Sequence, residues 1–274
     1  MPEPLVIVDE VVKRFRLARG EELVALDHVS FAIPRQQMFG LVGESGAGKS
    51  MVSRVILALT PIDGGSVLFD GIDVHALPAR ELRTLRRRMQ VVLQDPFAAL
   101  NRRQTVAQIV AAPLEAHGIG DRTARAARVS ELLDLVGLGP GYRTRRPREL
   151  SGGQCQRVAI ARALAVDPDF VVLDEAVSAL DVSIRAQILN LLADLQRRLG
   201  LTCLFVSHDL AVVRAVTSNI AVMRHGRIVE QGTREQLFGA AQHEYTRELM
   251  AAIPSTDPVA ERARRAAARR QAAA

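Results

Sequence analysis

The sequence predicts an α/β fold with a mostly parallel sheet, an N-terminal antiparallel β subdomain and an inserted helical subdomain. Strand-like apolar runs alternate with helical patterns over most of the 274 residues, as expected for a parallel sheet covered by helices. Two strand-like runs come first at the N-terminus. From about Pro96 to Arg162, helical patterns follow one another with no good strand between them, which indicates an insertion.

The first elements can be placed one by one. Residues 5–8 and 24–33 have strand composition and are separated by a polar, basic stretch, residues 13–22. A short apolar run over residues 38–42 predicts another strand. Helical spacing over residues 51–59 then predicts a helix that stops at Thr60-Pro61.

The later elements follow the same patterns. We expect helices over residues 79–88, 105–117, 123–136, 152–165, 182–199 and 210–216, and strands over residues 89–93, 170–173, 202–206 and 220–223. In the longest of these helices, Asp181 is available as the N-cap and Gly200 as the stop. Its apolar stripe predicts core positions at Ile184, Ile188, Leu191, Leu192, Leu195 and Leu199.

Composition excludes several classes of protein. The chain is 48% hydrophobic and 24% charged, a globular balance that excludes a disordered or collagen-like protein. Its apolar runs stop far short of the ~18 residues of a transmembrane helix. The start lacks a signal-peptide pattern, and the two cysteines, Cys155 and Cys203, cannot form a disulfide framework. We therefore expect a cytosolic protein.

The net charge of +6 would suit an anionic partner such as nucleic acid or a membrane surface. Only Lys13 and Lys49 among the 36 basic residues are lysine, however, so the excess of arginine indicates a background amino-acid bias. After Pro254 the chain becomes Ala/Arg-rich. We expect residues 254–274 to be a solvated, flexible tail, with lipid or partner binding as the alternative.

A glycine-rich motif lies between a predicted strand and a predicted helix. Gly43-Glu44-Ser45-Gly46-Ala47-Gly48-Lys49-Ser50 fits the pattern G-x-x-x-x-G-K-[ST]. Its glycines permit a tight loop whose backbone N–H groups converge on phosphate oxygens, and the helix N-terminus adds a favourable dipole. Lys49 would reach the β- and γ-phosphates, and the Ser50 hydroxyl would contact Mg²⁺. The motif predicts a nucleotide site rather than a plain glycine-rich turn.

Two adjacent carboxylates end the predicted strand over residues 170–173. Side chains at the carboxyl end of such a strand reach the ligand crevice of an α/β sheet. Asp174 suits Mg²⁺ coordination through water, and Glu175 suits polarising the water that attacks the γ-phosphate. The alternative is that one of them only caps the next helix.

A second candidate for phosphate binding is Leu150-Ser151-Gly152-Gly153-Gln154, which precedes a predicted helix. It offers a hydroxyl and two unhindered backbone N–H groups at a helix N-terminus. With this motif the chain resembles the ATP-binding cassette (ABC) family over residues 5–253. The resemblance implies a P-loop NTPase core over about residues 5–94 and 163–253, with a helical subdomain over about 95–162.

In that family two such domains dimerise head to tail. The resemblance therefore implies that Ser151, Gly152, Gly153 and Gln154 close over ATP held by residues 43–50 of a second ATP-binding subunit, either a sister chain or a copy of this one.

The resemblance assigns further residues. Gln94 matches the glutamine that links Mg²⁺ and the attacking water to the helical subdomain, and residues 178–181 match the loop that crosses the dimer interface. His208 matches the switch histidine, and Phe15 lies where the family stacks an aromatic ring on adenine. The alternatives are a helix-cap role for His208 and simple core packing for Phe15.

Two positions depart from the family pattern. Ala176 stands where many relatives have proline, which we expect to be tolerated because residue 176 contributes no catalytic side chain. Cys155 directly follows the serine-glycine motif. It is either a reactive thiol near the dimer seam or a semi-buried bystander, and we favour the bystander.

Three functional classes compete: a transporter motor, a nucleic-acid machine and a free-standing P-loop phosphotransferase. About a hundred residues separate Lys49 from Ser151, without the heptads or Cys pairs that repair and chromosome cassettes need. A phosphotransferase would not explain residues 150–154. The sequence therefore favours a transporter ATPase that hydrolyses ATP, and we expect no nucleic acid as partner.

The finer resemblance, in residues 94–101, 174–183 and 243–249, is to ATP-binding subunits of bacterial importers for peptides and nickel. It implies two transmembrane permease subunits as partners, an extracytoplasmic solute-binding protein indirectly, and a peripheral location on the cytoplasmic face of the inner membrane. Peptide is our choice of cargo, with nickel or another small solute as the alternative. Many relatives in this subfamily add a cysteine-rich extension after residues like 243–249, whereas here the Arg-rich tail follows residue 253. We therefore expect no metal-cluster role.

Overall fold

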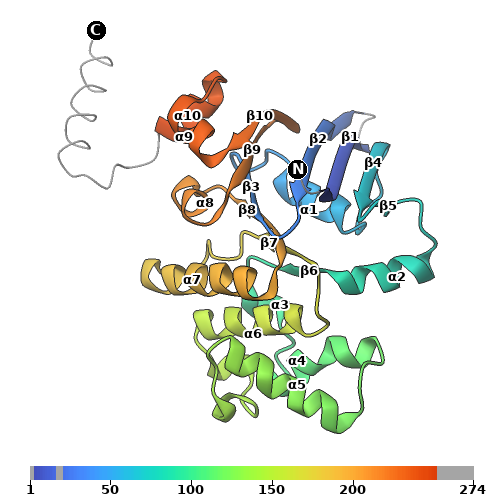
Figure 1. Ribbon diagram of the computed structural model, residues 1–274, viewed down its shortest axis with the longest axis vertical. Coiled ribbons are helices and arrows are strands. Elements are labelled where there is room, and N and C mark those ends of the chain that lie inside the picture. Colours follow the sequence, from blue (N-terminus) through green and yellow to red (C-terminus); the bar gives the residue numbers. More distant parts are fainter. Residues whose placement is uncertain (1–2, 17–20, 252–274) are drawn as a thin grey trace, which may run out of the picture.

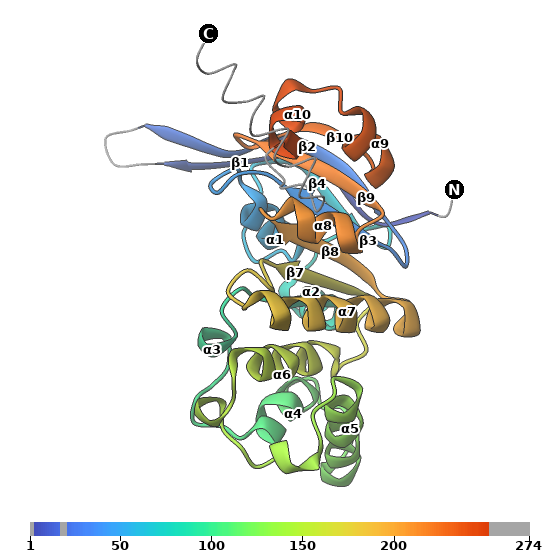
Figure 2. The same cartoon turned by 90° about the vertical axis from the view of Figure 1, so that its left-hand side faces the viewer.

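The computed structural model describes residues 3–16 and 21–251. The tail expected over residues 254–274 lies outside the described residues. The helices α3 (Pro96–Ala99), α4 (Val106–Ala116), α5 (Arg122–Leu135) and α6 (Gly152–Leu164) form one end of the molecule. Two sheets and the remaining helices form the other part, so the expected α/β fold with a helical insertion is confirmed (Figures 1 and 2).

A six-stranded sheet carries the centre of the fold. Its strand order is β10 (Arg227–Thr233), β9 (Asn219–Arg224), β3 (Met38–Val42), β8 (Thr202–Ser207), β7 (Phe170–Asp174) and β6 (Met89–Val92). All neighbours pair in parallel except β9 and β10. Every residue of β3 and β8 is buried, because helices or a second sheet cover both faces.

The second sheet is antiparallel, with the order β2 (Glu22–Pro34), β1 (Pro4–Arg16), β4 (Gly64–Phe69) and β5 (Ile72–Asp73). Strand β1 corrects the sequence prediction, because it continues through the basic stretch to Arg16. Lys13 is buried there and its Nζ lies 3.2 Å from the Asp63 carboxylate, while Phe15 pairs with Leu23 on β2. Strands β4, β5 and β10 were not predicted.

Helices α2 (Ala79–Arg88), α7 (Val182–Leu199) and α8 (Leu210–Val216) have the predicted bounds. Helix α1 (Lys49–Ile56) begins two residues earlier than predicted, which brings Lys49 and Ser50 into its first turn. Helices α9 (Arg234–Ala240) and α10 (Glu244–Ala251) were not predicted.

Helix α7 departs from the prediction in two details. Asp181 occupies the N-cap position, but its side chain makes no capping hydrogen bond within the described chain. Ile188, Leu192 and Leu195 are buried, whereas Leu199 is 47% exposed. The last turn is tied to the core through Gln196, whose amide donates to the Gln36 and Leu201 carbonyls, and Leu199 lies outside the covered stripe.

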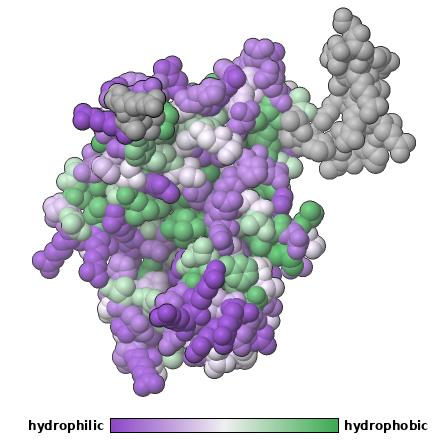
Figure 3. Space-filling view, turned by 180° about the vertical axis from the view of Figure 1, so that it is seen from behind, coloured by the Kyte–Doolittle hydropathy of each residue, from purple (hydrophilic) through white to green (hydrophobic). Residues whose placement is uncertain are grey.

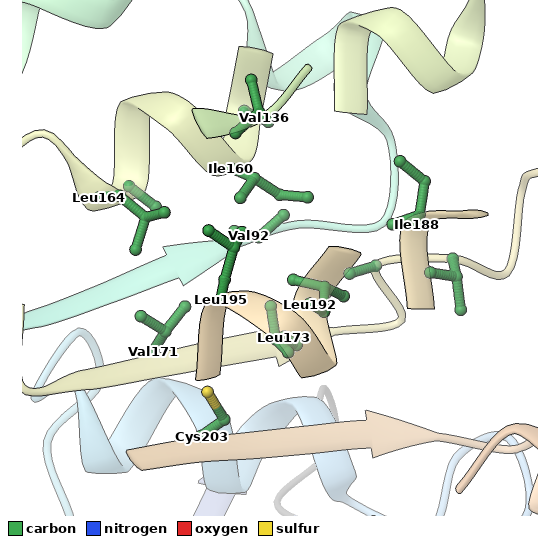
Figure 4. Close-up of a cluster of buried hydrophobic side chains, with 14 of the residues drawn as sticks. Val92, Val136, Ile160, Leu164, Val171, Leu173, Ile188, Leu192, Leu195 and Cys203 are labelled. Atoms are coloured by element: carbon green, nitrogen blue, oxygen red, sulfur yellow. The ribbon is translucent and has the colours of Figure 1, made fainter. Parts of the chain in front are cut away.

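The apolar core has two parts, one on each face of the six-stranded sheet. Figure 4 shows the part that joins the helical end to the sheet: Ile160 and Leu164 on α6 meet Leu192 and Leu195 on α7, above Val171 on β7. Burial of large aliphatic side chains gives ~1.5–3 kcal/mol each. This contact therefore fixes α6, and with it the Ser151 motif, relative to the sheet.

Figure 3 shows apolar side chains gathered around the middle of one face, between more polar ends. Over residues 3–16 and 21–251, no helix combines the length and the apolar character that crossing a bilayer requires.

Candidate nucleotide site

A cavity of about 690 Å³ lies at the carboxyl ends of β3 and β7, and residues of β1 and β2 also line it. It brings together residues from distant parts of the chain: Phe15, Leu23, Ala25, Gly43, Glu44, Ser45, Gly46, Gly48, Lys49, Ser50, Met51, Gln94, Glu175, His208 and Leu249. Most side chains predicted to act on one nucleotide therefore line one cavity.

The loop between β3 and α1 needs its glycines. Gly43 has φ 153°, and a Cβ there would lie 2.1 Å from the Met223 carbonyl oxygen. Gly48 has φ 105°, and a Cβ there would lie 2.7 Å from the Ala25 carbonyl oxygen. Both positions combine a backbone conformation and a close approach that only glycine accepts. Ala47 also lies in this loop, where it is buried.

Lys49 is folded into the loop. Its Nζ donates to the Gly43 and Glu44 carbonyls, each at 2.8 Å. Burial lowers the pKa of the Lys49 ammonium, while the nearby Glu175 and Asp174 carboxylates oppose this effect. The first N–H groups of α1 have no acceptor within the helix. Ammonium and amides together form a cationic cradle for phosphate.

Ser50 and Asp174 form the pair expected for a divalent cation. The Ser50 hydroxyl donates to Asp174 Oδ1 at 3.1 Å, which joins α1 to the end of β7. Burial raises the pKa of Asp174, and the hydrogen bond from Ser50 opposes the rise. Hydroxyl and carboxylate oxygens are the hard donors that Mg²⁺ prefers. The residues present therefore fit this ion.

Glu175 and His208 contact each other at the edge of the cavity. His208 Nδ1 lies 2.8 Å from the Glu175 carboxylate. Glu175 has φ 53° and its N–H donates to Val206, which fixes it between β7 and β8. The capping alternatives are wrong, because α7 begins only at Val182 and the N-cap of α8 is Asp209.

Phe15 and Gln94 both line the cavity. Phe15 is half-buried near the end of β1, with Lys13 Nζ 5.3 Å from its ring centroid. Gln94 is exposed and follows β6. It leads directly to α3, the first helix of the insertion.

The serine-glycine motif lies elsewhere. Ser151 is the N-cap of α6: its Oγ accepts from the Gln154 N–H, and the Gln154 side chain accepts from the Ser151 N–H. A Cβ on Gly153 would lie 2.5 Å from Ile184 Cγ2, whereas Gly152 has room. In the part of the chain that the structure describes, residues 151–154 do not line the cavity.

Three further residues were missed by sequence reasoning. The Tyr245 hydroxyl accepts from the Glu44 N–H of the phosphate loop at 3.1 Å, and Leu249 lines the cavity. Both belong to the segment 243–249, whose motif was the available signal. Arg185 donates to the Leu180 carbonyl and to Asp209 at 3.0 Å, which joins the loop before α7 to the residue after His208.

Residues 26–178 match the ABC transporter family. The chain is 50% identical over 255 residues to a putative peptide import ATP-binding protein of Brucella ovis, which covers 93% of this chain and 80% of that protein. It is 48% identical over 269 residues to a glutathione import ATP-binding protein of Salmonella paratyphi A, over 96% of this chain and 43% of that protein.

Solved structures agree. A dimeric ATP-binding cassette in a post-hydrolysis state, bound to ADP and Pi, superposes with a TM-score of 0.76 at 31% identity and covers 84% of this chain and 98% of its own. A cassette from Clostridium perfringens, part of an ABC transporter complex, has a TM-score of 0.77 at 27% identity, over 92% of this chain and 96% of its own. With its phosphate loop, paired carboxylates and matching fold, the chain belongs to the ABC transporter family.

Proposed function

We propose that this protein is the ATP-hydrolysing motor subunit of a bacterial ABC importer that takes up peptides. One observation carries the catalytic part: Lys49, Ser50, Glu175 and His208 line the same cavity, and Asp174, which is not among its lining residues, is hydrogen-bonded to Ser50. The import role and the peptide cargo are supported by the names of the relatives and by the motif in residues 243–249.

Each group of cavity residues has its own role in ATP hydrolysis. The loop amides and Lys49 bind the β- and γ-phosphates, and Phe15 stacks on adenine. Glu175 accepts a proton from the attacking water while the water oxygen bonds to the γ-phosphorus. The bond between the γ-phosphorus and the oxygen that leaves with ADP breaks in the same step. His208 holds the Glu175 carboxylate from the exposed side. The products are ADP and phosphate.

Mg²⁺ would be held by Ser50, Asp174 and Gln94: Ser50 and Gln94 line the cavity, and Asp174 is hydrogen-bonded to Ser50. When bound, the ion neutralises charge on the β- and γ-phosphates. The 3.1 Å contact between the two oxygens supports this assignment.

The working unit contains two cassettes. Ser151 and the following N–H groups form a phosphate-binding end, while the nucleotide of their own chain has the loop at residues 43–50. The γ-phosphate held by a sister subunit or a second copy is therefore the natural ligand. Closure on ATP and opening after hydrolysis give the membrane subunits two states to follow.

A surface suited to a membrane subunit lies beside Gln94. The preceding strand, β6, contributes Met89, Gln90 and Val91 to a groove of about 290 Å³, and the other residues that line this groove are Leu57, Leu59, Arg83, Arg86 and His117. Leu93 is 44% exposed and Phe97 36% exposed. Gln94 lines the nucleotide cavity, and residues just before it in the chain line this groove of mixed apolar and basic character. This proximity in the chain supports docking of a permease subunit here, on the cytoplasmic face of the membrane.

The first test is Glu175→Gln, which retains the shape of the side chain and removes the base. We expect ATP binding to remain and turnover to fall about a hundredfold or more, since general-base catalysis contributes ~10²–10⁴-fold. Glu131→Gln, on the exposed surface of α5, is the control. Unchanged hydrolysis by the Glu175 variant would remove this residue from its role.

Uptake measured in cells that carry the full transporter tests the cargo. Labelled dipeptide should accumulate with the native chain and not with Glu175→Gln. Accumulation of nickel instead of dipeptide would favour the alternative cargo.

A second prediction concerns Ser151→Arg. Because Ser151 lies outside the cavity of its own chain, ATP binding to the monomer should stay within about twofold, the effect of a few tenths of a kcal/mol expected for a surface change. Closure of the ATP-bound dimer and transport should be lost, because the arginine blocks the phosphate-binding end. Size-exclusion chromatography with ATP and Glu175→Gln as background measures closure. Normal closure and uptake would contradict the two-site arrangement for this chain.

A further inference from the structure

The C-terminal helix α10 contacts the phosphate loop, although no part of the catalytic scheme uses it. Its residue Tyr245 is 3% exposed, and its hydroxyl accepts a hydrogen bond from the Glu44 N–H at 3.1 Å. One turn further along the same helix, Leu249 lines the nucleotide cavity. Helix α10 therefore meets the site at two points, one polar and one apolar.

The polar contact lies close to the phosphate-binding ammonium. The Glu44 carbonyl accepts from Lys49 Nζ at 2.8 Å and from the Ala47 N–H at 3.2 Å. Tyr245 and Lys49 thus hold the two ends of the same residue. Loss of the Tyr245 hydroxyl would leave the N–H end of Glu44 free to turn.

The tyrosine ring is itself fixed against the central sheet. Arg224, at the end of β9, lies with its guanidinium carbon 4.6 Å from the ring centroid. The preceding residue, Met223, is the one whose carbonyl lies against Gly43. The end of β9, the start of the phosphate loop and Tyr245 therefore form one packed unit.

The start of α10 has its own attachment. The Glu230 carboxylate on β10 accepts from the Gln242 N–H at 2.7 Å and from the His243 N–H at 3.1 Å, and His243 Nδ1 accepts from the Tyr245 N–H. Thr246, next to the tyrosine, is buried. These contacts place the Tyr245 hydroxyl without help from the loop, so the hydroxyl can act as a fixed point for it.

We propose that α10 is a working wall of the nucleotide site, in which Tyr245 positions the phosphate loop and Leu249 contributes contact surface to the bound nucleotide. Tyr245 is a positioning residue, because it acts through Glu44. This inference rests on the proposed function, in that ATP is taken to bind at the loop. A loop held in its binding conformation needs less ordering when the nucleotide arrives.

A thermodynamic consequence follows. If packing of α10 against the phosphate loop favours ATP binding, ATP binding must favour this packing by the same factor. The nucleotide should therefore stabilise residues 244–251 against local opening, although most of this helix lies outside the cavity.

The experiment uses the full chain and two measurements. Tyr245→Phe keeps the ring against Arg224 and removes only the oxygen. We expect its ATP affinity, measured by calorimetry, to be roughly threefold to tenfold weaker, the range that loss of one hydrogen bond gives. Leu249→Ala should weaken ATP by a similar factor through lost apolar contact.

The matched control is Tyr142→Phe, the same change at the other tyrosine of the chain. The Tyr142 hydroxyl accepts from Gln154 Nε2 at 3.0 Å, away from the loop. Its removal should leave ATP binding by the monomer unchanged. Equal weakening by both tyrosine variants would overturn the proposal, because the effect would then be general.

Amide hydrogen exchange gives the reciprocal measurement. ATP should slow exchange in residues 244–251 of the native chain, less so in Tyr245→Phe, and not in Lys49→Ala. Native ATP binding with neither weakening by the two α10 variants nor protection of α10 would overturn this inference and leave the proposed function standing. Absence of ATP binding by the native chain would instead overturn the proposed function, and this inference with it.

Discussion

Among single residues, the two lysines stand out in a chain that otherwise uses arginine. Both are buried: Lys13 is 7% exposed and Lys49 6%. Each ammonium ends on oxygen acceptors, the Asp63 carboxylate for Lys13 and two loop carbonyls for Lys49. A compact ammonium on a flexible stem fits these positions, whereas a planar guanidinium with five donors would need more room and more acceptors. The arginine bias therefore ends where geometry demands lysine.

Cys155 directly follows the serine-glycine motif, but its surroundings do not favour a reactive thiol. It is fully buried, its thiol lies 3.6 Å from the Pro147 carbonyl, and burial raises its pKa to about 11. Cys203 is also buried, with its pKa raised to about 12. Since the thiolate is the reacting species, neither thiol should react in the native protein.

We predict that maleimide at pH 7.5 leaves both cysteines unmodified in the folded chain and modifies both in denaturant. Ala127→Cys, on the exposed side of α5, supplies a reference thiol that reacts at once. Mass spectrometry counts the added groups. Rapid labelling of Cys155 in the folded chain would restore the reactive-thiol alternative.

At the level of elements, the sequence predicts best those segments that bury one continuous stripe or run. Helix α7 and strand β3 were located this way, because their apolar spacing reflects what they pack against. Strand β10 was missed because it lies at the sheet edge and none of its residues is buried. Helix α10 buries only Tyr245 and Thr246, too few for a pattern.

The residues of the site likewise fall into those that a local motif predicts and those that depend on contacts between distant segments. Local motifs predicted the phosphate loop and the adjacent Asp174 and Glu175, since each is contiguous in sequence. The contact of Tyr245 with Glu44 spans 201 residues, and nothing local in either segment indicates it. Likewise, the Arg185 contact to Asp209 depends on how α7 and α8 pack.

Helix α6 has a buried polar side chain that the apolar pattern of the sequence does not explain. Gln156 is fully buried, and neither polar atom of its side chain has a hydrogen-bond partner among the described residues. An unsatisfied buried polar group costs about 1–3 kcal/mol. An amide left without partners in the folded state would oppose folding of α6, the helix that positions Ser151.

We predict that Gln156→Met, which has similar volume and no hydrogen-bonding groups to satisfy, increases the free energy of unfolding by about 1 kcal/mol. Urea denaturation measures it, with Gln187→Met on the exposed side of α7 as the control. A loss of stability larger than that of the control would show that the Gln156 amide makes favourable polar contacts.

In the whole molecule, a chain of charged side chains joins the two sheets. Asp70, in the turn between β4 and β5, accepts from Arg35 and from Arg88 Nη2, the latter at 2.7 Å. Arg88 Nε also donates to Asp169, just before β7, at 2.5 Å. The guanidinium carbon of Arg88 lies 5.1 Å from the centroid of the Phe69 ring. Two turns, one helix end and one strand start thus meet in one network between the antiparallel and parallel sheets.

This network predicts a dependence of stability on pH. Hydrogen bonds from Arg35, and then from Arg88, hold the pKa of Asp70 below its ordinary value of 3.8. A carboxylate with a lowered pKa in the folded state stabilises the protein above the pKa of the unfolded chain, and this stabilisation is lost as pH falls through the folded value.

Asp70→Asn should therefore lower the free energy of unfolding at pH 7 by about 1 kcal/mol, a value reduced for partial exposure. The difference from the native chain should stay constant down to about pH 5 and shrink below about pH 4. Urea denaturation across this range measures it, and Asp134→Asn, an exposed site without an ion pair in the described chain, serves as the control. A difference that grows on acidification would mean that the Asp70 carboxylate does not hold the two sheets together through its charge.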